Sequence, residues 1–210
     1  EPAAIVEAVR AAGLVGMGGA AFPTHVKLTQ NPKKPVDVLL VNGCECEPYL
    51  TADYRVMVEA PRGVVAGALL AARAAGARSV VIAVEKNKPR GITALREACR
   101  GTGAVVKELE TKYPMGGEKQ TVPAALGRTV PTGGLPLDVG VVVVNIGTAI
   151  SIARAVLRGA PVTHRVVTVT GHGVRTPKNL LVPIGAPYSD LIELAGGLTP
   201  ENVGAAIRAV

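Results

Sequence analysis

Aromatic residues are scarce in this sequence, which has no tryptophan, one phenylalanine and four tyrosines among 210 residues. The core must therefore be built from alanine, valine, leucine and isoleucine. Proteins that bind single-stranded nucleic acid stack bases on aromatic side chains, so the scarcity argues against that function. The 23 basic residues exceed the 16 acidic ones, for a net charge of +7. Because this surplus is spread along the chain, we interpret it as a solvated basic face and expect no nucleic-acid partner, with attraction of anionic ligands or membrane surfaces as the alternative.

Cysteines are also few. The three, Cys44, Cys46 and Cys99, cannot form a disulfide framework, which favours a reducing compartment. They form no Cys-x-x-Cys motif and cannot supply four thiolates to an iron–sulfur cluster. We find no metal-ligand spacing among the three histidines, so we expect no metal site.

Long apolar runs are absent as well. The longest such run, residues 63–72, is far shorter than the roughly 20 residues that span a bilayer. No signal-peptide pattern opens the chain, which starts without methionine. We therefore expect a soluble, cytoplasmic protein, and one that is a processed or excised piece.

Short apolar runs alternate with helical patterns over the first three quarters of the chain. Such alternation predicts an α/β fold, a Rossmann-like, mostly parallel sheet with helices on both faces. The predicted strands are residues 36–41, 79–84, 104–109 and 139–144, and the predicted helices are residues 2–12, 61–75, 91–100, 118–126 and 148–157, the last with Thr148 as N-cap.

The pattern changes near residue 160. Alternating Val and Thr over residues 165–170, a glycine turn, an apolar run over residues 179–184 and a helical pattern over residues 189–195 predict a hairpin followed by a helix. We therefore expect two domains, residues 1–160 and residues 161–210, the second a small α+β unit cut short by the chain end.

A glycine-rich loop over residues 13–24 is the first candidate site. Gly16, Gly18 and Ala21 fit a relaxed dinucleotide fingerprint, but a helix precedes the loop where that motif requires a strand. The glycines would still let the backbone approach a flat or phosphorylated ligand, and Lys27 adds a cation. A flexible connector is the alternative. Phe22 is either a ring that stacks on a ligand or a core anchor.

Three further motifs lie in predicted loops. Residues 42–49 (NGCECEPY) and residues 145–148 (NIGT) directly follow predicted strands, and residues 113–119 (YPMGGEK) precede a predicted helix. Ligands of open parallel sheets bind at the carboxyl ends of the strands, which suits the first two. The alternatives are a polar loop with incidental cysteines and a simple helix cap.

These four segments, in this order, resemble the C subunits of Rnf ferredoxin–NAD oxidoreductase complexes and, more distantly, the NADH-binding flavoprotein subunit of respiratory complex I. The residues that carry the resemblance are 13–28, 42–53, 113–120 and 134–149. It implies an FMN-binding α/β domain followed by the start of a β-grasp-like, soluble-ligand-binding domain.

The resemblance also implies site residues and no catalytic side chain, because the redox chemistry belongs to the cofactor. The implied FMN contacts are Gly16, Gly18, Gly19, Ala20, Lys27, Asn42, Cys44, Cys46, Asn145 and Thr148. The implied NAD(H) contacts are Phe22, Glu47, Tyr113 and Glu118.

By the same resemblance, this chain is the flavin-binding electron-transfer module of a membrane-associated oxidoreductase, exchanging hydride between NAD(H) and FMN. The implied partners are the other Rnf proteins of the complex and, indirectly, ferredoxin, at the cytoplasmic side of the membrane. The family's [4Fe–4S] clusters are expected only in a C-terminal part that is absent here. The alternatives are a similar flavoprotein of cobalamin or proline reduction, or a docking scaffold without flavin. Ala21 and Gly117 depart from the family pattern, which usually has glycine and, in the respiratory relative, a carboxylate there.

Overall fold

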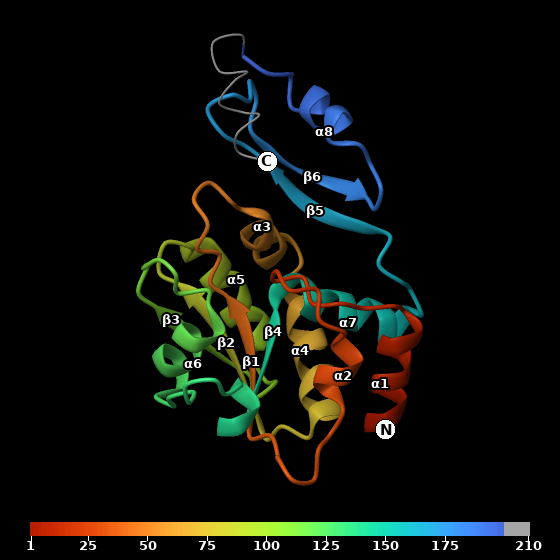
Figure 1. Cartoon of the computed structure of the whole chain (residues 1–210), viewed down its shortest axis with the longest axis vertical. Helices are drawn as coiled ribbons and strands as arrows, with labels where there is room; N and C mark the ends of the chain where they lie inside the picture. Colours follow the sequence, from red (N-terminus) through yellow and green to blue (C-terminus); the bar gives the residue numbers. More distant parts are fainter. Residues whose placement is uncertain (200–210) are drawn as a thin grey trace.

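The computed structural model describes residues 1–199. At its centre is a sheet of four parallel strands in the order β3-β2-β1-β4 (Figure 1). The strands are β1 (Val38–Gly43), β2 (Ser79–Glu85), β3 (Val105–Leu109) and β4 (Val141–Asn145). The predicted fold class, α/β with a mostly parallel sheet, is confirmed.

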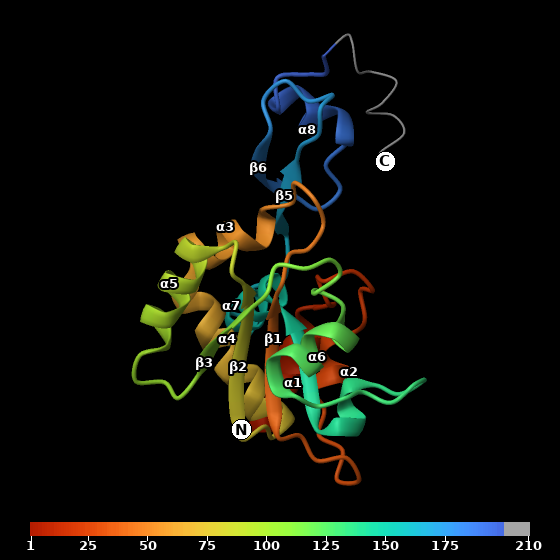
Figure 2. The same ribbon diagram turned by 90° about the vertical axis from the view of Figure 1, so that its left-hand side faces the viewer.

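Helices cover both faces of this sheet (Figure 2). One face carries α1 (Pro2–Ala11), α4 (Pro61–Ala75), α5 (Pro89–Cys99) and α7 (Ile146–Arg158), and the other carries α6 (Glu118–Leu126) and the 3₁₀ helix η1 (Pro136–Val139). Within residues 1–199, no helix combines the length and the apolar character that crossing a membrane requires.

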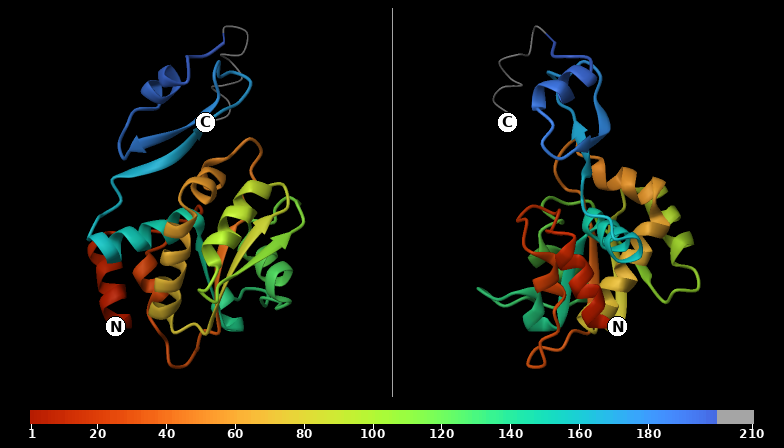
Figure 3. Two further views of the ribbon diagram at one scale, coloured as in Figure 1. Left: turned by 180° about the vertical axis from the view of Figure 1, so that it is seen from behind. Right: turned by 90° about the vertical axis from the view of Figure 1, so that its right-hand side faces the viewer.

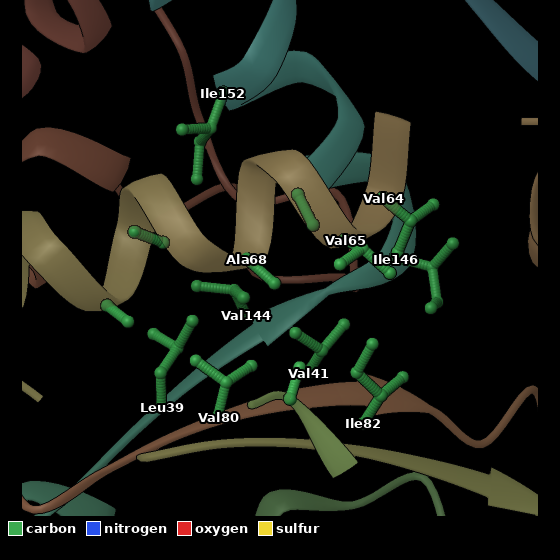
Figure 4. Packing of buried hydrophobic residues seen from close by; sticks show 14 of the residues in the cluster. Leu39, Val41, Val64, Val65, Ala68, Val80, Ile82, Val144, Ile146 and Ile152 are labelled. Atoms are coloured by element: carbon green, nitrogen blue, oxygen red, sulfur yellow. The ribbon is translucent and has the colours of Figure 1, made fainter. Parts of the chain in front are cut away.

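The strands are apolar at consecutive positions because both of their faces are buried. Leu39 and Val41 of β1 belong to the large core beneath α4, whereas Leu40 belongs to the smaller core beneath α6. Figure 4 shows α4 lying across the first of these faces, with Val64, Val65 and Ala68 directed toward the strands.

Two short helices were not predicted from the sequence, namely α2 (Thr24–Leu28) and α3 (Ala52–Glu59). The first has only five residues and the second has a single fully buried side chain, Met57, so neither leaves a clear apolar period in the sequence.

The ends of two strands differ from the predicted ones. β1 continues to Gly43 and β4 continues to Asn145, so Asn42 and Asn145 are strand residues rather than loop residues. The two asparagines are register partners on neighbouring strands. Gly43 can pair this closely because a Cβ there would lie only 2.8 Å from the Ala83 carbonyl oxygen.

The predicted N-cap of α7 is wrong. Asn145, not Thr148, caps the helix, and its Oδ1 accepts hydrogen bonds from the amides of Gly147 (2.8 Å) and Thr148 (3.3 Å). An N-cap side chain serves the amides two or three residues later, and Asn145 stands at that distance. The Thr148 hydroxyl instead accepts a hydrogen bond from the amide of Met17 (2.9 Å).

A smaller unit follows α7 and lies beyond one end of the sheet (Figures 1 and 3). It contains the antiparallel pair β5 (His164–Val169) and β6 (Lys178–Pro183), then α8 (Tyr188–Leu194). We call residues 164–199 the hairpin unit. The expected second domain extends to residue 210, and its residues 200–210 lie outside the described part of the chain.

The hairpin unit contacts the loop that precedes α3. The amide of Thr51 donates to the Thr168 hydroxyl at 3.1 Å, and Asn179 Nδ2 donates to the Thr51 hydroxyl at 2.9 Å. The Thr168 hydroxyl in turn donates to Asn179 Oδ1 at 2.7 Å. Nearby, the rings of Tyr49 and His172 meet edge to face with centroids 5.8 Å apart. These polar contacts set the position of β5 against the α/β unit.

The helices α4 and α7 cross with their backbones in contact. A Cβ on Gly67 of α4 would lie 1.7 Å from the Ala149 carbonyl oxygen of α7. No side-chain rotation could relieve that overlap, because both atoms belong to the backbone or are fixed to it. Glycine is therefore required at position 67 for this crossing.

We expect Gly67→Ala to lower the free energy of unfolding by about 3 kcal/mol, because the two helices must move apart and their core contacts loosen. Urea unfolding followed by circular dichroism measures the change. Gly63→Ala on the same helix is the control. A Cβ there would lie 3.1 Å from the Ile150 side chain, which can adjust, and alanine raises helix propensity. Equal stability of the two variants would contradict the crossing described here.

Candidate functional site

A cavity of about 640 Å³ opens at the carboxyl ends of β1 and β4. Its size is in the range of small-molecule and cofactor sites, and its place is where open parallel sheets bind ligands. The lining residues are Gly16–Phe22, Thr24, Lys27, Asn42, Cys44–Glu47, Leu50, Ala52, Asp53, Pro114, Gly116–Glu118, Val143–Asn145, Thr148 and Arg165.

The glycine-rich loop forms one wall of the cavity and is held at its base. The Gly16 amide donates to the Phe22 carbonyl at 2.8 Å, and the Thr24 amide donates to the Leu14 carbonyl at 3.0 Å. These bonds argue against the flexible-connector alternative. The amides of Gly18, Gly19 and Ala20 meet no protein acceptor among residues 1–199. The tip of the loop therefore offers free hydrogen-bond donors to a ligand.

Asn42 joins two walls of the cavity. Its Nδ2 donates to the Gly116 carbonyl at 2.7 Å, and its Oδ1 accepts from the Cys44 amide at 3.0 Å. The two loops approach so closely that a Cβ on Gly116 would lie 2.4 Å from the Cys44 carbonyl oxygen. The side chain of Asn42 is thus an internal tie as well as a lining group.

Cys44 and Cys46 differ in environment. The Cys44 thiol is buried among apolar side chains beneath α6, and burial, then the charge of Glu85, raises its pKa to about 12. It is therefore a thiol rather than a thiolate at neutral pH. Cys46 is partly exposed at the cavity. Residues 1–199 contain no cluster of three or more potential metal ligands.

Lys27 reaches into the cavity from α2. Its ammonium donates to Glu118 Oε1 at 3.0 Å and to the Val143 carbonyl at 2.9 Å. The cation is therefore already paired with one of the carboxylates that the resemblance places near NAD(H).

Asp53 lies at the start of α3, against β4. Asn145 Nδ2 donates to Asp53 Oδ2 at 2.5 Å, and Glu45 accepts hydrogen bonds from the amides of Asp53 (2.9 Å) and Tyr54 (3.3 Å). Burial, and then the negative charge of Glu45, raises the pKa of Asp53 to about 6. The raised pKa shows that burial removes water from the Asp53 carboxylate and so disfavours its charged form.

Thr24 supplies an unused polar group at this site. The residue is among those that line the cavity, yet its side chain is buried and its hydroxyl has no hydrogen-bond partner among residues 1–199. An unsatisfied buried hydroxyl is costly unless a ligand or water completes it.

The structure gathers most of the predicted site residues around one cavity. Only Tyr113 of the predicted set lies outside the lining, and its side chain is 65% exposed. Phe22 lines the mouth with its ring 49% exposed, so it is not a core anchor. The lining members are Gly16, Gly18, Gly19, Ala20, Phe22, Lys27, Asn42, Cys44, Cys46, Glu47, Glu118, Asn145 and Thr148.

Sequence reasoning missed Thr24, Glu45, Asp53 and Arg165 as site residues. Three of them stand inside the quoted motifs, but nothing in their spacing separates them from their neighbours. Arg165 comes from the hairpin unit, and only the packing of that unit against the sheet brings it to the cavity.

Comparison with known families gives two matches along the chain. Residues 9–154 match the Nuo51 FMN-binding domain, and residues 166–208 match the SLBB domain.

Individual proteins agree with these matches. The C subunit of the proton-translocating ferredoxin:NAD(+) oxidoreductase complex of Clostridium ljungdahlii is 50% identical over 195 residues, covering 93% of this chain and 43% of that protein. The C subunit of the ion-translocating oxidoreductase complex of Rhodobacter capsulatus is 46% identical over 202 residues, covering 95% and 39%. This chain thus spans less than half the length of either relative.

A solved structure shows the same fold. An NAD+-reducing NiFe hydrogenase in its H2-reduced state superposes with a TM-score of 0.77 at 25% identity, covering 93% of this chain and 39% of that chain.

We expect Gly116→Ala to lower the free energy of unfolding by about 2 kcal/mol, because the added Cβ displaces the Cys44 carbonyl and strains the Asn42 tie. Gly117→Ala is the control, since a Cβ there would lie 3.4 Å from the nearest atom, the Pro114 carbonyl oxygen. Urea unfolding of both variants measures the difference. A Gly116→Ala protein as stable as Gly117→Ala would show that the loops do not meet this closely.

The raised pKa of Asp53 predicts a pH-dependent stability. Between about pH 4 and pH 6 the folded chain holds the Asp53 proton more tightly than the unfolded chain, so the free energy of unfolding falls as pH rises. Relative to Asp53→Asn, the wild type should lose roughly 2 kcal/mol across that window. Urea midpoints at several pH values measure it. A difference that stays constant with pH would contradict the shift.

Proposed function

Because this chain belongs to the family of the Nuo51 FMN-binding domain, we propose that it binds FMN in the cavity and there exchanges hydride between FMN and NAD(H). Its resemblance to the C subunits of Rnf complexes is confirmed by relatives up to 50% identical along almost the whole chain. Those relatives are subunits of ion-translocating oxidoreductase complexes.

The open amides of the glycine-rich loop, in a cavity of cofactor size at the carboxyl ends of the strands, are the observation that carries this proposal. The amides of Gly18, Gly19 and Ala20 have no protein acceptor among residues 1–199. A flat, phosphorylated ligand with many acceptor oxygens would satisfy such donors, and the absence of side chains on the two glycines leaves room for its close approach. The residues present therefore fit FMN.

Each wall would serve the ligand differently. The amides of the glycine-rich loop would bind acceptor oxygens, and Asn145 and Thr148 would hold the ribityl-phosphate side. Asn42, Cys44 and Cys46 would face the flavin, although the buried Cys44 thiol leaves its backbone as the part nearest the cavity. Gly16 and Lys27 are the remaining residues of the implied FMN set. Gly16 would contribute to the wall formed by the glycine-rich loop, and Lys27 would contribute a positive charge.

A nicotinamide nucleotide would enter at the exposed side of the cavity. Phe22 offers a half-exposed ring on which it could stack. Glu47 and Glu118 would lie beside it, and Glu118 already accepts a hydrogen bond from the Lys27 ammonium. Tyr113 lies outside the lining, so a role for it requires movement of the loop over residues 113–117. Bound FMN would supply the hydride acceptor, and the chain's share is binding, orientation and exclusion of water.

The wider role follows from the relatives. We propose that the chain is a module of a larger membrane-associated complex, peripheral to the membrane on its cytoplasmic side, that passes electrons toward ferredoxin through clusters held elsewhere. The names of the relatives, which include ferredoxin:NAD(+) oxidoreductase, support this proposal.

We also propose a domain boundary near residue 160. Two observations support it: the parallel sheet and α7 end by Arg158, and the antiparallel pair begins at His164. The separate family matches, residues 9–154 and 166–208, fall on either side. The first domain would be residues 1–160 and the second would begin at residue 161.

The direct test is anaerobic. The 210-residue chain is incubated with FMN, freed of excess and mixed with NADH while the visible absorption band of oxidised flavin is followed. We expect bound flavin that bleaches on NADH addition. Flavin that stays oxidised would overturn the NAD(H) part of the proposal, and a protein without flavin would favour a docking scaffold.

A pair of variants tests whether FMN binds in this cavity. Thr24→Val removes the unpartnered hydroxyl at almost constant volume, so it should weaken FMN binding by about 10-fold without lowering stability. The exposed Thr29, whose hydroxyl donates to the His25 carbonyl, provides the control Thr29→Val, which should leave FMN affinity unchanged. Fluorescence titration measures both. Equal FMN affinities of the two variants would remove Thr24 from the site.

A further inference from the structure

Arg165 is the one lining residue that comes from the hairpin unit, within the described residues 164–199. It stands on β5, and its Nη2 donates to the Met17 carbonyl in the glycine-rich loop at 3.1 Å, across 148 positions of sequence. Its positive charge also acts on Asp53. The guanidinium therefore lies where the loop, the start of α3 and the end of β4 meet.

The charges around the cavity are mostly negative. Four carboxylates line it, namely those of Glu45, Glu47, Asp53 and Glu118, against two cations, Lys27 and Arg165. A ligand with phosphoryl groups would be repelled by this set unless a cation were free to meet it. A phosphorylated ligand therefore requires a cation that is not already paired with a carboxylate.

The two cations are engaged differently. The ammonium of Lys27 forms a salt bridge with Glu118 and also donates to the Val143 carbonyl. Arg165 forms no salt bridge within 4.0 Å among residues 1–199, and one of its donors is used by the neutral Met17 carbonyl. A guanidinium has five N–H donors in a planar fork that matches phosphate oxygens, so Arg165 keeps donors for a ligand.

The hairpin unit holds Arg165 in place. Three residues later on the same strand, Thr168 accepts from the Thr51 amide and donates to Asn179, which itself donates to the Thr51 hydroxyl. This polar contact anchors β5 against the loop before α3. Arg165 is thus presented to the cavity from a supported strand.

We propose that Arg165 binds a phosphoryl oxygen of the nucleotide held in this cavity, so that the hairpin unit completes the ligand site. The inference rests on the proposed function, because it takes a flavin or nicotinamide nucleotide as the ligand. It assigns to the hairpin unit a share in ligand binding, beyond its packing against the sheet.

The test compares ligands that differ only in phosphate. For the unmodified 210-residue chain and for Arg165→Gln, affinities for FMN and for riboflavin are measured by fluorescence titration. Arg165→Gln should weaken FMN binding by about 10- to 100-fold, the usual loss for a charge-assisted hydrogen bond, and leave riboflavin binding unchanged. Arg165→Lys keeps the charge without the fork and should recover part of the loss.

A second pair of ligands separates the two sources of phosphate. Flavin-loaded protein is reduced either with NADH or with dihydronicotinamide riboside, which lacks phosphate. If Arg165 meets the pyrophosphate of the nicotinamide nucleotide, Arg165→Gln slows reduction by NADH selectively and leaves the preference for FMN over riboflavin intact. Either selective loss supports the proposal and tells which phosphoryl group is bound.

Arg175→Gln is the matched control. Arg175 belongs to the same unit, donates to a backbone carbonyl, that of Leu198, and does not line the cavity. It should show neither selective loss. Circular dichroism and urea midpoints confirm that each variant is folded.

Three results would overturn the inference. If Arg165→Gln weakens FMN and riboflavin equally, Arg165 only positions the glycine-rich loop through Met17. If no ligand is affected, Arg165 has no role in binding. If the unmodified chain binds neither flavin, the proposed function fails and this inference fails with it, whereas the first two results leave the proposed function standing.

Discussion

The pairing of β1 with β4 is the constraint on which the cavity depends. Their register sets Asn42 beside Asn145 at the carboxyl edge of the sheet. From there, the first asparagine holds the loop at Gly116, and the second caps α7 and meets Asp53. A slip of one residue would turn one of these side chains to the opposite face of the sheet and dismantle two walls of the cavity at once.

Close backbone approach is the second recurring feature. α4 and α7 touch at Gly67, the cavity loops touch at Gly116, and a Cβ on Gly18 would lie 3.2 Å from the Asn145 side chain. Few aromatic side chains are available to fill space, so the chain gains contact by bringing backbones together where glycine permits it. The lack of side chains on the glycines likewise leaves the amides of the glycine-rich loop open to a ligand.

The charges that line the cavity are unevenly balanced. Its carboxylates outnumber its cations, and one cation is already paired with a carboxylate. Glu45 accepts hydrogen bonds from the first amides of α3, which stabilises the start of that helix. Burial, and then the charge of Glu45, raises the pKa of the neighbouring Asp53. A phosphorylated cofactor would therefore depend on neutral donors such as loop amides and the Thr24 hydroxyl, and on the guanidinium brought in by the hairpin unit.

The sequence by itself determined the parallel α/β fold, the change of pattern near residue 160 and the segments that line the cavity, because buried strands, helix ends and glycine clusters leave local signatures. It also identified the family through four ordered motifs. Only the tertiary structure decided that Asn145 rather than Thr148 caps α7, that Thr24 has an unpartnered hydroxyl and that Arg165 reaches Met17. The cap is a local contact, but which residue provides it depends on where β4 ends, and the pairing of β4 with β1 sets that end. The other two depend on groups that meet in space across many residues of chain, and residue spacing carries no record of such meetings.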